Sequence, residues 1–241
     1  MEAQKPKTVH SGRDFLKEVG IIVLGVLIAL GAQQLVSEAR DSQLAQETRA
    51  TARAELKASL DAFVNRRATQ ACINRRLDEV STLLQASAKP GYKPPTWIGR
   101  PQRWGFSSAG WDAAAQGGRV ALLSQKEQAA FGEIYARLHD FNALQLEEQR
   151  AWADIRQLED QPQVDLQMRA RVRSALQEAR LANWNVRVDL EQTLAGVGAL
   201  GVAIRTDRLS SSPSICLPLS TPRDAAVAKV NAYFKDQLGE P

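Results

Sequence analysis

The residues able to perform acid–base or metal chemistry are few and scattered in this sequence. Only two histidines occur, His10 and His139, and no second histidine or cysteine lies near His139 at the spacing of a zinc site. As a catalytic base, His139 would need a nucleophile and an orienting acid, and the sequence places neither beside it. Phosphate-binding glycine loops follow a strand, whereas Gly117-Gly118 and Gly196-Val197-Gly198 follow no strand pattern. We therefore predict no catalytic residue, no metal site and no cofactor, and a protein that is not an enzyme.

The charged residues favour an ordinary solvated surface. Lys and Arg number 31 and Asp and Glu 27, which gives a formal net charge of +4 over 241 residues. The pairs Arg66-Arg67 and Arg75-Arg76 alternate with acids such as Asp61 and Asp78, as on a solvated helix face. A surface that follows a phosphate backbone needs a larger positive excess. We predict no nucleic-acid partner.

A stretch without any charge lies between Glu18 and Glu38. It is apolar on all sides from Val19 to Ala32, and with the residues that follow it supplies the about 20 residues that cross a bilayer. A cleaved signal peptide and a buried core helix are the alternatives. Acids at its start and a helical pattern that runs past Ala32 argue against cleavage. We predict a transmembrane helix over residues 18–37.

The flanks of this stretch predict its orientation. Four basic residues lie within the first 17, whereas beyond the span Arg40 stands alone until Arg49. The positive-inside rule then places residues 1–17 in the cytoplasm and residues 38–241 across the membrane. We predict a bacterial inner (plasma) membrane protein, in contact with the lipid bilayer, whose C-terminal domain is periplasmic.

The positions of the two cysteines are consistent with this predicted orientation. Cys72 and Cys216 both fall in the part predicted to lie outside the cytoplasm, where a lone pair favours a disulfide. In the chain-entropy model a loop of this length adds about 4–5 kcal/mol to stability. Two unrelated buried thiols are the alternative.

The residues around the anchor resemble those of a known family. The arrangement consists of Glu18, Gly25-Val-Leu-Ile-Ala-Leu30, Gln33-Gln34 and Glu38. It is similar to the anchor of a bacterial family of short proteins, a domain of unknown function, whose members carry an asparagine pair and a tryptophan where this chain has the glutamines and Leu35. A second likeness covers Trp111–Ser124 and the helix up to Tyr135. The resemblance implies membrane anchoring and a helical outer domain, and it implies no activity or site residue.

Beyond the span the pattern is helical. No glycine or proline occurs from Glu38 to Ala88, and apolar residues recur at three- and four-residue steps. Ser124 and Glu127 match a capping box, and Asp165 is a good N-cap. We predict helices over 38–88, 124–160, 165–204 and 222–238. The predicted fold is all-α, a single N-terminal transmembrane helix that continues into an antiparallel helical bundle.

Residues 89–123 form an irregular segment rich in proline and aromatic residues. Trp97, Trp104 and Trp111 lie in it. They could line a ligand groove, or they could cover the open end of the bundle, since large aromatic side chains bury much area. We favour the cap.

Small residues follow one side of the anchor. Gly25, Ala29 and Ala32 lie at four- and three-residue steps, and a shallow side of this kind allows close helix packing in lipid. We predict self-association or docking to another membrane or envelope protein.

These features together favour a membrane-anchored, non-enzymatic interaction or scaffold module of the cell envelope. The alternative is an extracytoplasmic ligand-binding sensory bundle. That alternative requires a membrane partner, because the predicted cytoplasmic tail is too short to hold an output domain.

Overall fold

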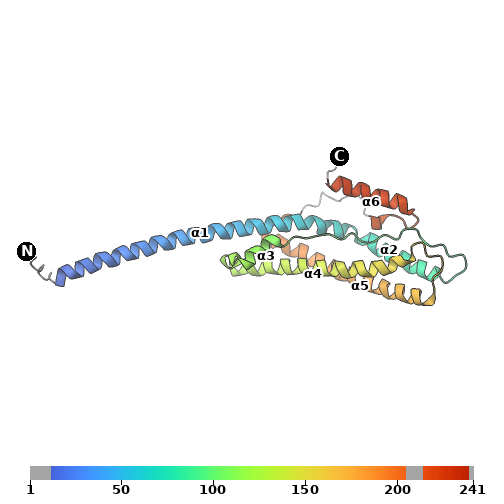
Figure 1. Cartoon of the computed structure of the whole chain (residues 1–241), viewed down its shortest axis with the longest axis horizontal. Helices are drawn as coiled ribbons and strands as arrows, with labels where there is room; N and C mark the ends of the chain where they lie inside the picture. The colour runs from blue at the N-terminus through green and yellow to red at the C-terminus, as the bar shows by residue number, and fades with distance from the viewer. Residues whose placement is uncertain (1–11, 205–213, 239–241) are drawn as a thin grey trace, which may run out of the picture.

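The chain is all-α, as predicted. The structure, a computed structural model, describes residues 12–204 and 214–238, and within them the chain forms six α-helices, several short 3₁₀ turns and no strand. The predicted cytoplasmic tail, residues 1–17, falls mostly outside the described residues. Figure 1 shows one long helix that projects from a bundle of the others.

The long helix α1 spans Gly12–Ala68, which is 57 residues or about 85 Å of helix. Its apolar N-terminal part is exposed along its length, and by length and composition it could cross a membrane. The helix begins to pack on the bundle at Ala45, which is buried. The exposed apolar segment and the bundle are therefore connected by one continuous helix (Figure 1).

The predicted helix over 38–88 is interrupted. α1 ends at Ala68, and α2 spans Gln70–Ala86. The Thr69 hydroxyl donates to the Arg66 carbonyl at 2.9 Å, and a side-chain bond of this kind bends a helix without glycine or proline.

A second difference lies within residues 89–123, which are not wholly irregular. They contain α3, Ala109–Gln116, and a 3₁₀ turn, Arg119–Leu122. Gly118 precedes that turn with φ at +71°, in the left-handed region that favours glycine.

Helices α4 and α5 form the body of the bundle. α4 spans Gln125–Ile155 and α5 spans Leu166–Val197, and they run antiparallel to each other (Figure 1). The predicted capping box at Ser124 and Glu127 and the predicted N-cap at Asp165 are both confirmed.

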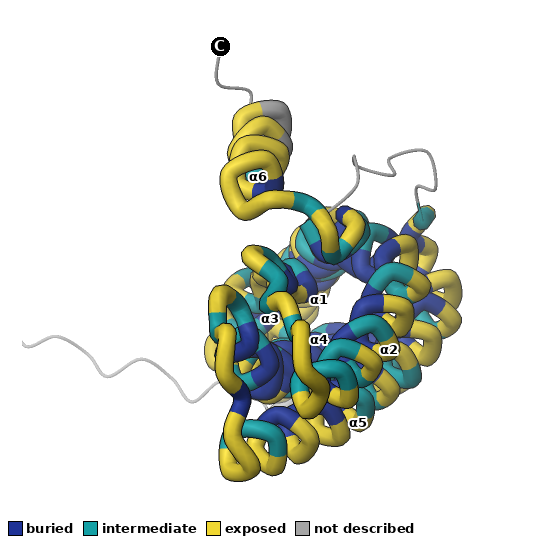
Figure 2. Tube along the Cα trace, turned by 90° about the vertical axis from the view of Figure 1, so that its right-hand side faces the viewer, coloured by how far each residue is buried: buried dark blue, intermediate teal, exposed yellow. Residues whose placement is uncertain are grey.

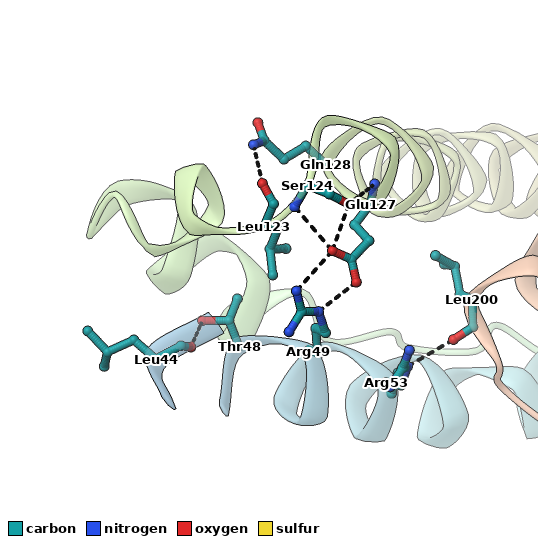
Figure 3. Close-up of polar contacts among 9 residues, drawn as sticks. All are labelled: Leu44, Thr48, Arg49, Arg53, Leu123, Ser124, Glu127, Gln128 and Leu200. Carbon is teal, nitrogen blue, oxygen red and sulfur yellow. Dashed lines mark hydrogen bonds and ion pairs between the residues drawn. The ribbon is translucent and has the colours of Figure 1, made fainter. Parts of the chain in front are cut away.

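An ion pair fastens the start of α4 to α1. The Glu127 carboxylate accepts from Arg49 Nε at 2.6 Å and from the Ser124 amide at 3.1 Å (Figure 3). The ion pair and the helix cap hold the pKa of Glu127 at about 2. The Glu127 side chain thus caps α4 and links it to α1.

The chain ends with α6, Arg223–Leu238. This helix follows a 3₁₀ turn, Ser214–Cys216, which packs on α2. In the end-on view α6 lies on the side of the bundle opposite α5 (Figure 2). The outer face of α5 is therefore not covered by α6.

The buried apolar residues form two clusters. The proximal cluster, nearer the anchor, includes Leu56, Phe63, Phe141, Val186 and Leu190. The distal cluster includes Ile73, Trp152, Ile155, Val172 and Ile215. On α1–α2, on α4 and on α5, the residues that contact the proximal cluster end, and those that contact the distal cluster begin, at the level of the α1–α2 break.

Candidate interaction surface

A buried polar network separates the two apolar clusters. Arg66 Nη2 donates to Glu148 Oε1 at 2.6 Å and to Asn183 Oδ1 at 3.0 Å. Gln70 also donates to Asn183, which donates in turn to Asn74 at 2.8 Å. The helices α1, α2, α4 and α5 thus each contribute a polar residue at the level where the two apolar clusters meet.

Burial dominates the electrostatics of this network. The Arg66 and Glu148 side chains are each 1 % exposed. Burial raises the pKa of Glu148 and lowers that of Arg66, and the attraction between the two groups opposes both shifts. Arg66 Nε and Nη1 have no hydrogen-bond partner within the described residues. The pair is buried, and with Asn183 it joins α1, α4 and α5 through hydrogen bonds.

Residues 95–108, which we call the strap, run along α4. Buried Gln145 accepts from the Trp104 amide and donates to its carbonyl, at 2.8 and 3.0 Å. Beyond the end of α4, Glu159 Oε1 accepts from the Ile98 amide at 2.9 Å. A buried extended backbone needs such partners, and here polar side chains of α4 and of the turn after it supply them.

The three tryptophans of this segment lie far apart. Trp97 packs under Arg156, the Trp104 backbone bonds α4 near its middle, and Trp111 stacks on Tyr135 with centroids 4.9 Å apart. From residue 135 to 156, α4 rises about 30 Å. The structure therefore does not bring Trp97, Trp104 and Trp111 into one groove.

Cys72 and Cys216 form a disulfide. Their Cα atoms lie 4.8 Å apart, and 144 residues separate them in sequence. Beside it, Arg75 Nη2 donates to the Cys216 carbonyl at 2.8 Å. The bond attaches the 3₁₀ turn before α6 to α2.

The remaining residues singled out in the sequence lie on open surface. His139 is 58 % exposed, and its Nε2 lies 4.0 Å from Asp112. Gly25, Ala29 and Ala32 are exposed on α1. Among the described residues no group of three or more His, Cys, Asp or Glu could hold a metal ion.

An apolar ridge follows the outer face of α5. Trp184 is 54 % exposed and Leu181 is 61 % exposed, and Val188 continues the same face one turn further on. We call these three residues the α5 ridge. Large apolar side chains grouped on an open face are typical of a binding surface.

The side of the ridge toward α4 is hollowed and acidic. Two shallow hollows, of about 400 and 280 Å³, share Asn185 and follow the groove between α4 and α5. Four carboxylates and one arginine line this α4–α5 groove: Asp140, Glu147, Glu178, Asp189 and Arg150. Burial and the nearby Asp140 raise the pKa of Asp189 to about 6, although Arg137 opposes the rise.

The side of the ridge toward α2 is hollowed and basic. A hollow of about 780 Å³ lies over the α1–α2 break, and we call it the α2–α5 hollow. Its charged lining is Arg67, Arg180, Arg187 and Asp78. Trp184 lines both this hollow and the α4–α5 groove, so the ridge separates surfaces of opposite charge.

Comparison with known protein families, with characterised proteins and with solved structures finds no match to this chain. The resemblance of the anchor to a domain of unknown function stays a prediction from its residues. The α5 ridge is the feature that sequence reasoning missed. Its signal was Leu181, Trp184 and Val188 at three- and four-residue steps, on a helix whose core face already had its own apolar stripe.

Proposed function

We propose that this chain is a bacterial inner-membrane protein whose periplasmic helical domain binds a protein partner through the α5 ridge and performs no chemistry itself. The observation that carries the proposal is the exposure of Leu181 and Trp184 between two charged hollows. Buried aromatic anchors surrounded by polar residues are the usual centre of a protein interface.

Two further features support this function. The apolar part of α1 is long enough for a bilayer span, and about 14 Å of helix lies between its end near Val36 and Ala45, where packing begins. This short stalk would hold the bundle close to the membrane surface. The Cys72–Cys216 disulfide suits an oxidising compartment such as the periplasm.

The membrane topology can be tested separately from the binding surface. We expect a reporter that is active only outside the cytoplasm to be active when fused after Pro241. An inactive fusion would overturn the orientation and the periplasmic assignment together.

The binding surface can be tested in native membranes with a photo-crosslinking amino acid at position 184. A matched control places the same amino acid at Lys57, which is exposed on α1 and away from the ridge. We expect a discrete crosslinked protein at position 184 that is absent at position 57 and that is lost when Leu181→Asp is added. If positions 184 and 57 give the same products, the proposed function is refuted.

A further inference from the structure

We infer that the partner bound at the α5 ridge is a second copy of this chain, packed in parallel about a two-fold axis along the bundle. This inference rests on the proposed function, since it specifies which partner the ridge binds. Three observations carry it: the direction of the anchor, the opposite charges on the two sides of the ridge, and the heights of those charges.

The anchor restricts how two copies can meet. Each α1 enters the bundle from the same end (Figure 1), so two copies in one membrane stand side by side with their α5 helices parallel. An antiparallel pair would place the two anchors at opposite ends. The two-fold axis of a closed pair is therefore along the membrane normal.

Such an axis brings unlike surfaces together. Rotation by 180° about an axis beside Trp184 places the α4–α5 groove of each copy against the α2–α5 hollow of the other. The groove has four carboxylates against one arginine, and the hollow has three arginines against one aspartate. The surface is thus complementary to itself, and complementary charge is what fixes the register of an interface.

The heights of the charges agree with a parallel pair. In that arrangement each residue faces residues at its own level in the partner. Arg187 and Asp189 are two residues apart on α5, as are Glu178 and Arg180, and each pair differs by about 3 Å in height. Asp140 lines the same part of the groove as Asp189.

Some of these charges have an ion-pair partner among the described residues, and others do not. Arg180 pairs with Asp78 at 3.0 Å, and Arg67 lies 3.7 Å from Glu191. Within the described residues, neither Arg187 nor Asp140 forms an ion pair. These two residues are therefore the ones whose reversal should affect association most and the fold least.

Position 184 offers a direct test, because a residue near a two-fold axis meets its own copy. In the full-length chain in native membranes, we expect Trp184→Cys to give a dimer on a non-reducing gel that reducing agent converts to monomer. Lys57→Cys is the matched control and should give at least about tenfold less dimer, the ratio for a difference of about 1.4 kcal/mol.

Charge reversal tests the complementarity itself. Arg187→Glu and Asp140→Arg, each added to Trp184→Cys, should both lower the dimer about tenfold, because each creates two like-charge contacts per pair. When the two variant chains carry different tags and are co-expressed, the mixed dimer should return to within about twofold of the Trp184→Cys level. In that pair one contact is native and the other has both charges exchanged.

The outcomes separate this inference from the proposed function. If Trp184→Cys gives no more dimer than Lys57→Cys while the photo-crosslinker at 184 captures a different protein, the ridge is an interface and the second copy is the wrong partner. If co-expression does not restore the mixed dimer, the two-fold arrangement is wrong. If neither crosslink forms at 184, both proposals fail.

Discussion

The stability of the chain should fall much more when one member of the buried Arg66–Glu148 pair is replaced than when both are replaced. Replacing Glu148 with leucine leaves a buried guanidinium whose remaining bond is to Asn183 and whose Nε and Nη1 have no partner within the described residues. Breaking a buried pair in this way costs about 3–5 kcal/mol. A domain has a total stability of only about 5–15 kcal/mol, so the single variant should be close to unfolding.

The double variant Arg66→Met with Glu148→Leu should recover most of that loss. Both charges are then removed, and Asn183 keeps its bonds to Gln70 and Asn74. Replacing a buried ion pair by apolar side chains is neutral or stabilising by about 1–4 kcal/mol. The double variant should therefore be more stable than Glu148→Leu alone by on the order of 3–5 kcal/mol.

Urea unfolding of the full-length chain in detergent, followed by tryptophan fluorescence, measures these differences. All five tryptophans lie beyond the anchor, so the signal reports the bundle alone. With a slope of about 2–3 kcal/mol/M, the Glu148→Leu midpoint should fall by about 1–2 M. Glu133→Leu is the matched control on α4, since Glu133 is 64 % exposed in its pair with Arg137, and it should cost under about 1 kcal/mol.

Either of two results would refute this reasoning. In the first, Glu148→Leu lowers the unfolding free energy no more than Glu133→Leu does. In the second, the double variant is as unstable as Glu148→Leu. In either case Arg66 and Glu148 would not be a water-excluded pair whose energies depend on each other. The separation of the two apolar clusters would then need another explanation.

Three further predictions concern contacts elsewhere in the bundle. Reduction, or the double variant Cys72→Ala with Cys216→Ala, should lower stability by about 5 kcal/mol for a separation of 144 residues; an unfolding midpoint that is equal with and without reductant would contradict this. Gln145→Leu should cost about 1–3 kcal/mol because it leaves a part-buried amide and carbonyl of the strap unpaired. Gln149→Leu removes one bond and should cost about half as much in the same urea titration. Because the pKa of Glu127 is lowered to about 2, its contribution, on the order of 1 kcal/mol for a partly exposed pair, should be present above pH 4.5 and lost as the pH falls toward 2. The Tm of Glu127→Gln should accordingly depend less on pH over that range than the Tm of the parent chain, and equal slopes would count against the ion pair.

Local signals in the sequence predicted the elements whose causes are local. The capping box at Ser124 and the N-cap at Asp165 each depend on residues within a few positions of one another, and α4 and α5 begin where these signals lie. The all-α class follows from the same short-range periodicity.

The α5 ridge had a local signal, but two other features that sequence reasoning missed, the end of α1 and the burial of Arg66, depend on distant residues. Thr69 ends α1 without a glycine or proline, in a turn beside the bond between Arg66 and Glu148, two residues 82 positions apart. Arginines interleaved with acids look solvated in sequence, and only the packing shows that Arg66 is buried while its neighbour Arg67 is 44 % exposed. The sequence analysis singled out Trp97, Trp104 and Trp111, which lie in one irregular segment, whereas Trp184 is the tryptophan on the candidate surface.

The continuity of α1 has a consequence for how many neighbours one chain can have. At about 100° per residue, Gly25, Ala29 and Ala32 lie roughly on the opposite side of α1 from Leu56 and Phe63, which face the bundle. Two chains that packed through these small residues would therefore direct their bundles away from each other. Contact through the anchors and contact through the α5 ridge cannot join the same two chains, so copies that made both contacts would form rows in the plane of the membrane.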